Sequence, residues 1–340
     1  MQYNEIMNLV FAHFGSPIPK HLLLNLERCT ALFPDHQIFL ITDINLKMKN
    51  IVIYNYTASE DWWKLYNRLK HSKNFRNNFW FTSSARFLAL ADFSKTIEGD
   101  FLHIESDVII AEDFPFKSLS KSNYDIIFPI VSDSNAIASC LYVRNSETAD
   151  YLANLTLSES QKNNLTTDMY ILSVLSKEAN LNFSPLPTAP SNYYLRKESN
   201  TRFLQLSDIA AAEFVGFFDG FDIGRYLFGD DPRNSRGWSI LRDNDTRTYL
   251  DVRDLDLVTK PEREFPYIQD SSSNSYVPLY SLHVHSKNLN LFKVDKSKKL
   301  IHYYVSKSKD KSKKVFVFSV FLNSAFKALM SRVKKLATRV

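Results

Sequence analysis

The sequence predicts a layered α/β fold. From the amino terminus onward, apolar runs that suit strands alternate with segments of helical periodicity. Hydrophobic residues make up 44% and aromatic residues 14% of the 340 residues, so the chain can bury a sizeable core. It contains neither a P-loop nor a dinucleotide-binding glycine pattern, and five of its seven glycines fall between Gly216 and Gly237. If the protein binds phosphates, we therefore expect a metal ion to help.

Candidate elements follow one another at short intervals along the chain. The first part predicts a strand at Ile6–Phe11, a helix carrying Leu22, Leu26, Cys29 and Phe33 that Pro34 ends, and strands at Gln37–Thr42 and Ile51–Tyr54. The segment Asp61–Phe93 has mostly helical periodicity, with Arg86 one step beside its apolar stripe. Beyond it we expect strands at Phe101–Ile104, Tyr124–Ile130 and Ala138–Val143, a short helix capped by Asn145 and Ser146, and a helix at Leu165–Leu175 capped by Thr166 or Thr167.

An acidic triplet, Glu105-Ser106-Asp107, follows the strand predicted at Phe101–Ile104. Side chains at i and i+2 share one face of an extended backbone, so both carboxylates can reach one cation. In open α/β sheets, ligands collect beyond the carboxyl ends of the strands, which is where this triplet lies. A divalent cation there would take oxygen ligands, and a nucleotide diphosphate would supply the remainder. The alternative is a solvated acidic turn.

Two further charged residues allow a structural and a functional interpretation. Arg86 would point near the strand ends if its helix precedes the Phe101 strand, and a surface ion pair is the alternative. Asp168 lies in the first turn of a predicted helix, where the helix dipole alone favours a carboxylate. Its functional alternative is a contact with sugar hydroxyls.

Two later segments suggest binding. Phe214–Trp238 combines glycine, aromatic residues, Asp and Arg, a mixture typical of a loop that stacks on sugar rings, with a helical hairpin as the alternative. Further on, His283 and His285 stand at i and i+2 of a predicted strand, with Lys287 behind them. Such histidines are often packing residues, but after an acidic triplet upstream a metal ligand is the better interpretation.

Charge and cysteine content narrow the class of protein. The formal net charge is +5, but Ser306–Val340 holds eight Lys and two Arg against one Asp, a net charge of +9, which leaves −4 for the other residues. No nucleic-acid partner is expected, because its footprint would be a basic patch on the folded body. Cys29 and Cys140 imply no disulfide framework and favour a reducing compartment. Without a secretory pattern or a membrane-spanning apolar run, we expect a cytoplasmic catalytic part.

The basic tail carries its own pattern. Behind the charge run KSKDKSKK, an apolar stripe predicts an amphipathic helix, and its members are Phe318, Leu322, Ala325, Leu329, Val333 and Leu336. Such a helix suits a peripheral position on the anionic inner face of the plasma membrane, where each cation contributes about 1 kcal/mol. Packing on its own domain or on a partner subunit is the alternative.

Five segments in sequence order resemble the DXD-type glycosyltransferases of the GT-A fold, with the motif order of glycosyltransferase family 8 and of bacterial surface-polysaccharide and lipopolysaccharide enzymes. They are FWFTSSARFLAL, FLHIESDVII, ASCLYVRN, TTDMYIL and LHVHSKNL, and the resemblance covers roughly Asn8–Phe292. It implies a single Rossmann-like α/β/α domain with a mixed sheet at residues 1–300 and an acceptor-binding insertion at about 200–275. The basic amphipathic tail, predicted from its own pattern, adds a C-terminal helical extension at 301–340.

The resemblance also implies roles for individual residues. The implied donor-binding residues are Phe11 and Ala12 beside the base, Arg86, Glu105, Ser106, and Lys287 on the diphosphate. The implied metal ligands are Asp107, His285 or His283, and Glu105. Asp168 would touch the donor sugar or the acceptor. Glu105 is one methylene longer than the Asp usual at its position in the family, where that residue lies near the ribose.

These features predict a hexosyltransferase that moves a sugar from a nucleotide diphosphate to a saccharide or lipid-linked acceptor. The departing diphosphate gains negative charge, which a divalent metal and a lysine stabilise. Imidazole beside carboxylate ligands favours Mn²⁺ over Mg²⁺. Asp219 and Asp222 are candidates for an acceptor contact or a catalytic base. A carbohydrate-binding or regulatory protein with an inactive donor site, and a metal-dependent nucleotidyltransferase or phosphohydrolase, stay open as alternatives.

Overall fold

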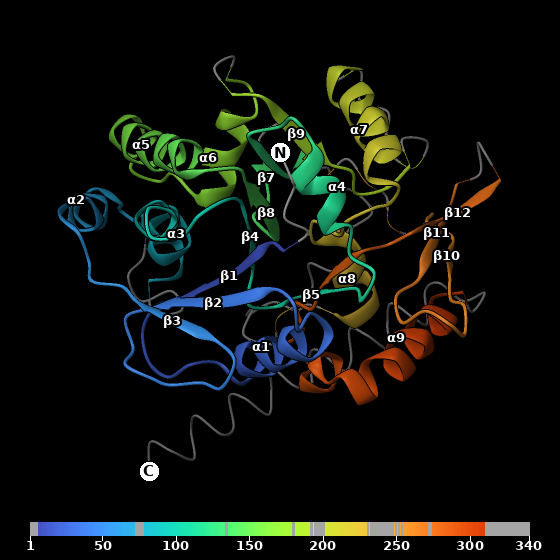
Figure 1. Cartoon of the computed structure of the whole chain (residues 1–340). Coiled ribbons are helices and arrows are strands. Elements are labelled where there is room, and N and C mark those ends of the chain that lie inside the picture. The colour runs from blue at the N-terminus through green and yellow to red at the C-terminus, as the bar shows by residue number, and fades with distance from the viewer. Residues whose placement is uncertain are drawn as a thin grey trace, which may run out of the picture. The chain divides into compact units, whose positions relative to one another are not determined.

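The computed structural model describes residues 6–71, 78–132, 135–178, 181–190, 193, 201–229, 231, 248, 250, 252, 254–270 and 274–309. Figure 1 shows the helices and strands of the chain, which divides into two compact units. The first unit comprises Met1–Ser106 and Pro115–Leu186, and the second comprises Asp107–Phe114 and Pro187–Val340. The chain therefore leaves the first unit directly after Ser106 and returns to it at Pro115.

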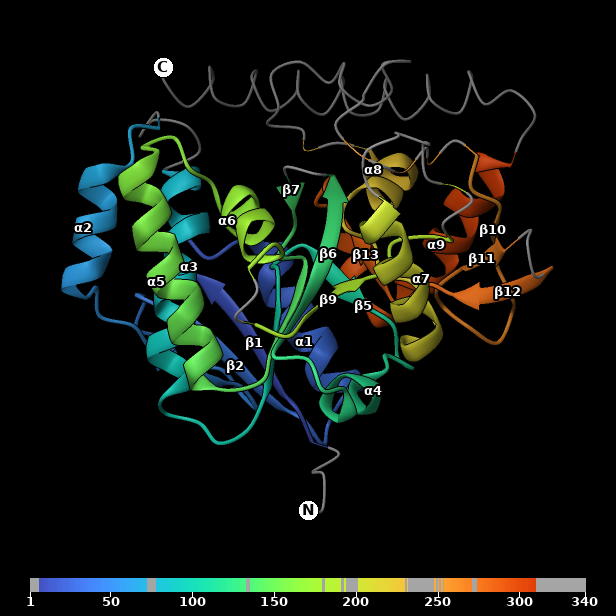
Figure 2. The same cartoon turned by 90° about the horizontal axis from the view of Figure 1, so that it is seen from above.

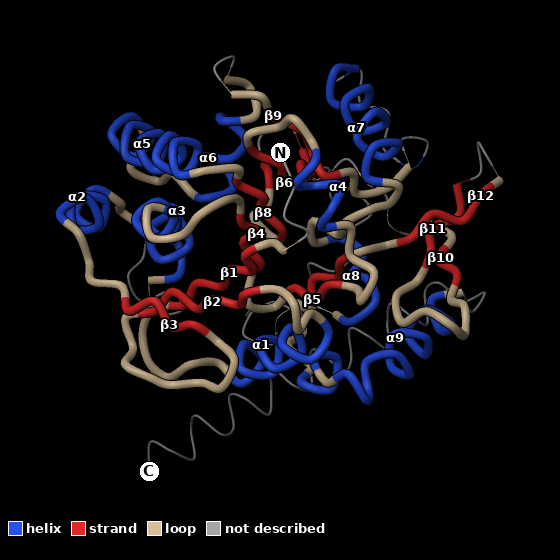
Figure 3. Tube along the Cα trace, viewed as in Figure 1, coloured by secondary structure: helices blue, strands red, loops and turns tan. Residues whose placement is uncertain are grey.

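A mixed sheet forms the centre of the first unit (Figure 3). Its strands are β1 (Asn8–His13), β2 (Gln37–Thr42), β3 (Val52–Asn55), β4 (Phe101–Ile104), β6 (Ile126–Ser132), β7 (Asn135–Ala136), β8 (Cys140–Val143) and β9 (Phe183–Leu186). Within the described residues the order is β3-β2-β1-β4-β8-β6-β7, and β9 pairs with β6. Strands β1 to β4 run parallel, whereas β8 runs antiparallel to both β4 and β6. The predicted α/β class with a mixed sheet is confirmed.

Helices cover both faces of this sheet. They are α1 (Lys20–Leu32), α2 (Glu60–Arg68), α3 (Phe79–Ser94), α4 (Phe116–Lys121), α5 (Ser146–Lys162) and α6 (Asp168–Leu175). Figure 1 shows α1 and α3 on opposite sides of β1 and β2. Because α3 packs on the strands and also against α5, nearly its whole circumference is buried (Figure 2). The buried stretch includes Arg86, which is 9% exposed.

Most elements predicted in the first unit are confirmed, with shifts at their ends. The helical segment Asp61–Phe93 contains two helices, α2 and α3. Asn145 caps α5 by accepting a hydrogen bond from the Thr148 N–H, but α5 has 17 residues, so the prediction of a short helix was wrong. Thr167 rather than Thr166 caps α6, since its hydroxyl accepts from the Tyr170 N–H. This cap fixes the first turn, from which Asp168 projects.

Short strands and helices build the second unit. They are β5 (Val108–Ile110), α7 (Thr201–Phe214), α8 (Asp222–Phe228), β10 (Leu257–Val258), β11 (Tyr267–Asp270), β12 (Ser275–Pro278), β13 (Ser281–His283), the 3-10 helix η2 (Leu289–Phe292) and α9 (Val294–Ser308). Strand β13 pairs antiparallel with β5, and α8 packs against β13 and α9. Strands β10, β11 and β12 form a separate antiparallel sheet.

A buried arginine ties the segment 107–114 into the second unit. Arg263 is 5% exposed and donates to both carboxylate oxygens of Asp113 at 2.9 Å. Its remaining N–H groups donate to three backbone carbonyls, those of Phe265, Pro266 and Leu279. All five guanidinium donors are thus engaged in one fixed geometry. The segment that carries Asp107 is therefore held to the rest of this unit by a side chain as well as by β13.

The later predicted segments are only partly described. Helix α8 lies within Phe214–Trp238, whereas residues 230 and 232–238 fall outside the described residues. Helix α9 runs through the boundary expected between residues 300 and 301, and the tail from residue 310 onward also lies outside them. No helix among the described residues is long and apolar enough to cross a membrane. The domain boundaries and the amphipathic tail stay predictions.

Candidate functional site

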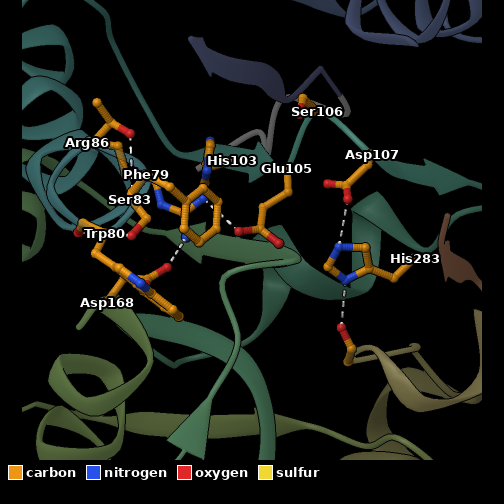
Figure 4. A network of polar contacts seen from close by, with 12 residues as sticks. Phe79, Trp80, Ser83, Arg86, His103, Glu105, Ser106, Asp107, Asp168 and His283 are labelled. Carbon is orange, nitrogen blue, oxygen red and sulfur yellow. Dashed lines mark hydrogen bonds and ion pairs between the residues drawn. The ribbon is translucent and has the colours of Figure 1, made fainter. Parts of the chain in front are cut away.

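Two clusters of charged and polar side chains stand out, one in each unit (Figure 4). The Arg86 cluster, in the first unit, consists of Arg86, Glu105 and Asp168. The Asp107 cluster, in the second unit, consists of four side chains, namely Asp107, His283, His285 and Lys287. Both clusters contain residues that the sequence analysis named as candidates.

The Arg86 guanidinium lies between two carboxylates. Its Nη1 donates to Glu105 Oε1 at 2.6 Å and its Nη2 donates to Asp168 Oδ2 at 2.5 Å (Figure 4). The side chains of Arg86, Glu105 and Asp168 are 10%, 18% and 9% exposed. The alternative of a surface ion pair for Arg86 is therefore wrong. Because water screens these charges little, they hold one another in place more firmly than an exposed pair would.

Burial and charge shape the protonation of this cluster. Burial alone would lower the pKa of the Arg86 guanidinium, but the carboxylates of Glu105 and Asp168 raise it on balance. Arg86 therefore stays charged. Burial raises the pKa of the Asp168 carboxyl, and the Arg86 charge opposes that rise. The first turn of α6 adds a favourable dipole for the Asp168 carboxylate.

A buried histidine lies beside this cluster. His103 Nδ1 donates to the Val10 carbonyl at 3.0 Å, and burial together with the Arg86 charge lowers the His103 pKa to about 3. The ring is therefore neutral, with Nε2 as a hydrogen-bond acceptor. Among the described residues, neither His103 Nε2 nor Arg86 Nε has a hydrogen-bond partner. Sequence reasoning missed His103, although it lies in the strand that leads to the acidic triplet.

Strand β13 brings two imidazoles to Asp107. The register pairs His283 with Val108, and the Val284 N–H donates to the Asp107 carbonyl at 2.7 Å. His283 Nε2 lies 3.1 Å from Asp107 Oδ2 (Figure 4). The His285 ring stacks on the His283 ring with centroids 3.9 Å apart. One ligand atom from each of these three side chains lies within 4.8 Å of the others. Donors about 2.0–2.2 Å from a shared ion have comparable spacings, so the set fits a metal.

The orientation of His283 also fits a metal ligand. Its Nδ1 lies 2.9 Å from the Gly220 carbonyl oxygen, which can only accept, so Nδ1 carries the proton. The other ring nitrogen, Nε2, then faces Asp107. Metal-ligating histidines are commonly held in this way, with the second ring nitrogen donating to a carbonyl or carboxylate. Sequence reasoning missed Gly220, and its only signal was its place in the glycine-rich segment.

Lys287 completes the Asp107 cluster from a turn after β13. Its backbone is left-handed, with φ at 52°, and its N–H donates to the Val284 carbonyl at 2.9 Å. Its ammonium contacts Asp107 Oδ2. A non-glycine residue in this conformation costs on the order of 1 kcal/mol, so the surrounding structure must over-determine it. The turn thereby directs the lysine cation at the carboxylate.

Glu105 differs from its predicted place. Strand β4 ends at Ile104, and Ser106 and Asp107 form a turn, so the backbone is not extended across the acidic triplet. The Glu105 carboxylate pairs with Arg86, whereas the group with metal-ligand spacing contains Asp107 without Glu105. The i and i+2 rule for one shared face does not apply across a turn. The contacts thus give the two acids separate partners.

The remaining donor-binding candidates occupy the end of β1 and the turn after β4. Phe11 is fully buried in β1, and Ala12 is half-buried. The Ser106 hydroxyl lies 3.3 Å from His21 Nε2, and its carbonyl accepts from Asn25 Nδ2 at 3.3 Å. Ser106 is thus positioned by α1. A nucleotide contact by these residues stays a prediction.

The two acids proposed for the acceptor side lie at the amino-terminal end of α8. Asp222 is half-buried in its first turn. Asp219 is 1% exposed, and its carboxylate accepts three backbone N–H groups. Burial raises the pKa of the Asp219 carboxyl, and the hydrogen bonds oppose that rise. These two neighbouring acids therefore stand in different environments.

No family model and no curated protein matches this chain. Among solved structures, it aligns with an active-site mutant of LgtC at 15% identity, over 59% of this chain and 83% of the other, with a TM-score of 0.39. It aligns with the apo form of the glycosyltransferase GlyE of Streptococcus pneumoniae TIGR4 at 14% identity, over 53% and 44%, with a TM-score of 0.35. The bifunctional IspDF of Campylobacter jejuni aligns at 11% identity, over 54% and 50%, with a TM-score of 0.30.

Proposed function

We propose that this protein is a metal-dependent glycosyltransferase that moves a sugar from a nucleotide diphosphate to a saccharide or lipid-linked acceptor. The observation that carries the proposal is the Asp107 cluster, in which a carboxylate and two imidazoles gather beside a lysine ammonium. Three protein ligands leave coordination positions open, which is typical of catalytic rather than structural sites. A diphosphate is an anion that can use both the open positions and the ammonium.

The ligand set favours Mn²⁺ over Mg²⁺. Two imidazole nitrogens and one carboxylate form a mixed set, whereas Mg²⁺ prefers oxygen ligands and retains water. Asp107, His283 and His285 would hold the ion. When bound, the ion would stabilise the negative charge that develops on the departing diphosphate.

Lys287 would contribute a second positive charge. Its ammonium contacts Asp107 Oδ2, the same oxygen that lies 3.1 Å from His283 Nε2. If a cation takes that oxygen, the ammonium loses this partner and becomes available to an anionic group of the donor. We therefore assign Lys287 to the donor diphosphate.

The Arg86 cluster supports a sugar-binding role in the first unit. Glu105 and Asp168 are carboxylates oriented by one guanidinium, and charge-assisted hydrogen bonds to hydroxyl groups are strong and directional. Asp168 would accept from a hydroxyl of the donor sugar or the acceptor. Glu105 would accept from a ribose hydroxyl. Asp222, half-buried at the start of α8, stays the candidate for an acceptor contact.

A thermal-shift screen of nucleotide sugars with and without Mn²⁺ tests the proposal. We expect a Mn²⁺-dependent rise in Tm in the wild type, and loss of that rise in Asp107→Asn and in His285→Ala. Glu112→Gln is the matched control, because it removes an exposed carboxylate from the same segment. A Mn²⁺-dependent shift that persists in either ligand variant excludes that residue as a ligand. A wild type that shows no such shift contradicts metal dependence.

The reaction products separate glycosyl transfer from the other enzyme classes. Incubation with the donor that gives the largest shift should release a free nucleoside diphosphate. Pyrophosphate or inorganic phosphate would instead indicate a nucleotidyltransferase or a phosphohydrolase. A donor that binds without turnover of any kind would indicate a carbohydrate-binding or regulatory protein.

We also propose that the basic tail attaches the protein peripherally to an anionic membrane face. Residues 310–340 hold six Lys and two Arg against one Asp, a net charge of +7. A truncation after Lys309 leaves α9 whole, including its buried Val305. We expect the full chain, but not the truncated one, to sediment with vesicles that contain anionic lipid. Equal sedimentation of the two proteins would contradict this role.

A further inference from the structure

Asp219 joins α8 to the strand that carries His283. Its Oδ1 accepts from the Ile223 N–H at 3.0 Å, and its Oδ2 accepts from the Gly224 N–H at 2.7 Å. The same Oδ2 accepts from the backbone N–H of His283 at 2.9 Å. The Asp219 N–H in turn donates to the Ser281 hydroxyl at 3.0 Å. One buried side chain thus links the first turn of α8 to the end of β13.

The residue after Asp219 fixes the His283 ring. The Gly220 carbonyl accepts from His283 Nδ1 at 2.9 Å, so the position of this carbonyl fixes the orientation of the ring. Gly220 directly follows Asp219, so the hydrogen bonds of Asp219 hold the backbone on the amino-terminal side of Gly220. His283 is therefore bound twice by the same turn, through its backbone N–H and through its ring.

The close approach of α8 to β13 makes these bonds possible. A Cβ at Gly224 would clash with the His283 carbonyl oxygen and would lie 2.8 Å from Asp219 Oδ2. Only a glycine lets the helix backbone lie so near the strand. The contact depends on Gly224 and on Asp219 together.

We infer that Asp219 is a positioning residue for the metal ligand His283, and neither an acceptor contact nor a catalytic base. The inference rests on the proposed metal function of the Asp107 cluster. A base must direct a lone pair at a proton of the substrate, but Asp219 is 1% exposed and three backbone N–H groups occupy its carboxylate. What Asp219 controls is the orientation of His283, because it accepts from the His283 N–H and holds the turn whose Gly220 carbonyl binds His283 Nδ1, so that Nε2 faces the proposed metal site.

The variant Asp219→Asn tests this role with little change in volume. In either orientation of the new amide, its NH₂ group faces at least one backbone N–H, so the turn loses a hydrogen bond. We expect the Kd for Mn²⁺ alone, measured by calorimetry on the metal-free protein, to rise about 10- to 100-fold, the effect typical of lost outer-shell partners. Asp295→Asn, which removes an exposed first-turn acid from α9, should leave the Kd unchanged.

Histidine NMR gives a readout that does not depend on metal binding. In metal-free wild type labelled with ¹⁵N-histidine, we expect the Nδ1 proton of His283 to exchange slowly with water, because it is buried against the Gly220 carbonyl, and we assign it by the signal lost in His283→Gln. In Asp219→Asn this proton should exchange faster. If the Asn variant does not fold, Ser281→Ala removes the hydroxyl that accepts from the Asp219 N–H and should raise the Kd about threefold, the effect of one weak hydrogen bond.

A folded Asp219→Asn with a Kd within twofold of wild type overturns the inference, as does an unchanged exchange rate of the His283 Nδ1 proton. A wild type that binds no Mn²⁺ defeats the proposed metal function instead. In that case the exchange rates of the His283 Nδ1 proton in the metal-free proteins still decide whether Asp219 orients His283.

Discussion

Replacing Arg86 by Met should destabilise the first unit more than any loss of a surface charge. The change removes the cation and keeps much of the aliphatic volume. Glu105 and Asp168 would then remain as two carboxylates, 18% and 9% exposed, without the guanidinium that now binds both. Breaking a buried ion pair by removing one partner costs about 3–5 kcal/mol. We expect a loss in the upper part of this range at pH 7.5, because two acids lose their partner at once.

The loss should shrink as the pH falls. Burial already raises the pKa of the Asp168 carboxyl above its ordinary value of 3.8, and without the opposing Arg86 charge it should rise further. A carboxyl with a raised pKa in the folded state binds protons more tightly there than in the unfolded chain. Its contribution to the free energy of unfolding therefore falls as the pH rises through that window. The variant should regain stability between pH 7.5 and pH 5, relative to wild type.

Urea-induced unfolding at pH 7.5 and pH 5.0, followed by tryptophan fluorescence, measures this difference. Trp62, Trp63 and Trp80 lie in the first unit. Lys95→Met is the control, because the Lys95 pair with Asp150 is 51% and 43% exposed and should contribute less than about 1 kcal/mol. A loss for the Arg86 variant no larger than that of the control, or an equal loss at both pH values, would refute the reasoning.

Three further outcomes follow from buried groups. Arg263→Lys should lower the free energy of unfolding by about 2–4 kcal/mol in urea titrations, because an ammonium cannot bind Asp113 and three carbonyls together. Unchanged stability would contradict the role of Arg263 in holding the segment 107–114 to the second unit. Burial raises the pKa of the Cys29 thiol to about 12, and Cys140 is also buried, so neither should react with a thiol reagent at pH 8 until the chain unfolds; rapid labelling of native protein would be inconsistent with this. The pKa of His103 is lowered to about 3, so its NMR signals should not titrate between pH 7.5 and pH 4.5. Because the unfolded chain takes up a proton at this histidine below about pH 6.5 and the folded chain does not, the free energy of unfolding should fall as the pH is lowered through that range.

Local patterns predicted much of the first unit. Strand β2 has the predicted limits, and Thr167 caps α6 as one of two expected choices. These features depend on side-chain periodicity and on hydrogen bonds within three or four residues, which a sequence contains directly. The helix α5 was longer than expected, because its apolar positions pack on α3, a contact that local sequence does not display.

Part of the grouping expected for the candidate site appears in the structure. Asp107, His283 and His285, which the motif order implied as metal ligands, each have one ligand atom within 4.8 Å of the others, and their binding of a metal stays a prediction. Glu105 was assigned to the same ion on the assumption of an extended backbone. The turn at Ser106 and the partner Arg86, 19 positions earlier, decide its place instead. The Glu105 carboxylate pairs with the cation that lies nearest to it, and the fold determines that this cation is Arg86.

Asp219 is a second residue whose role could not be predicted from the local sequence. In a segment rich in glycine and aromatic residues, an acid that faces a substrate and an acid that caps a helix have the same sequence signature. Here the approach of α8 to β13, which Gly224 permits, turns the carboxylate inward onto three N–H groups, one of them belonging to His283. The role of Asp219 therefore depends on how closely the backbones of α8 and β13 can pack. Gly224, two positions after Asp222, is the residue in the sequence that allows this packing.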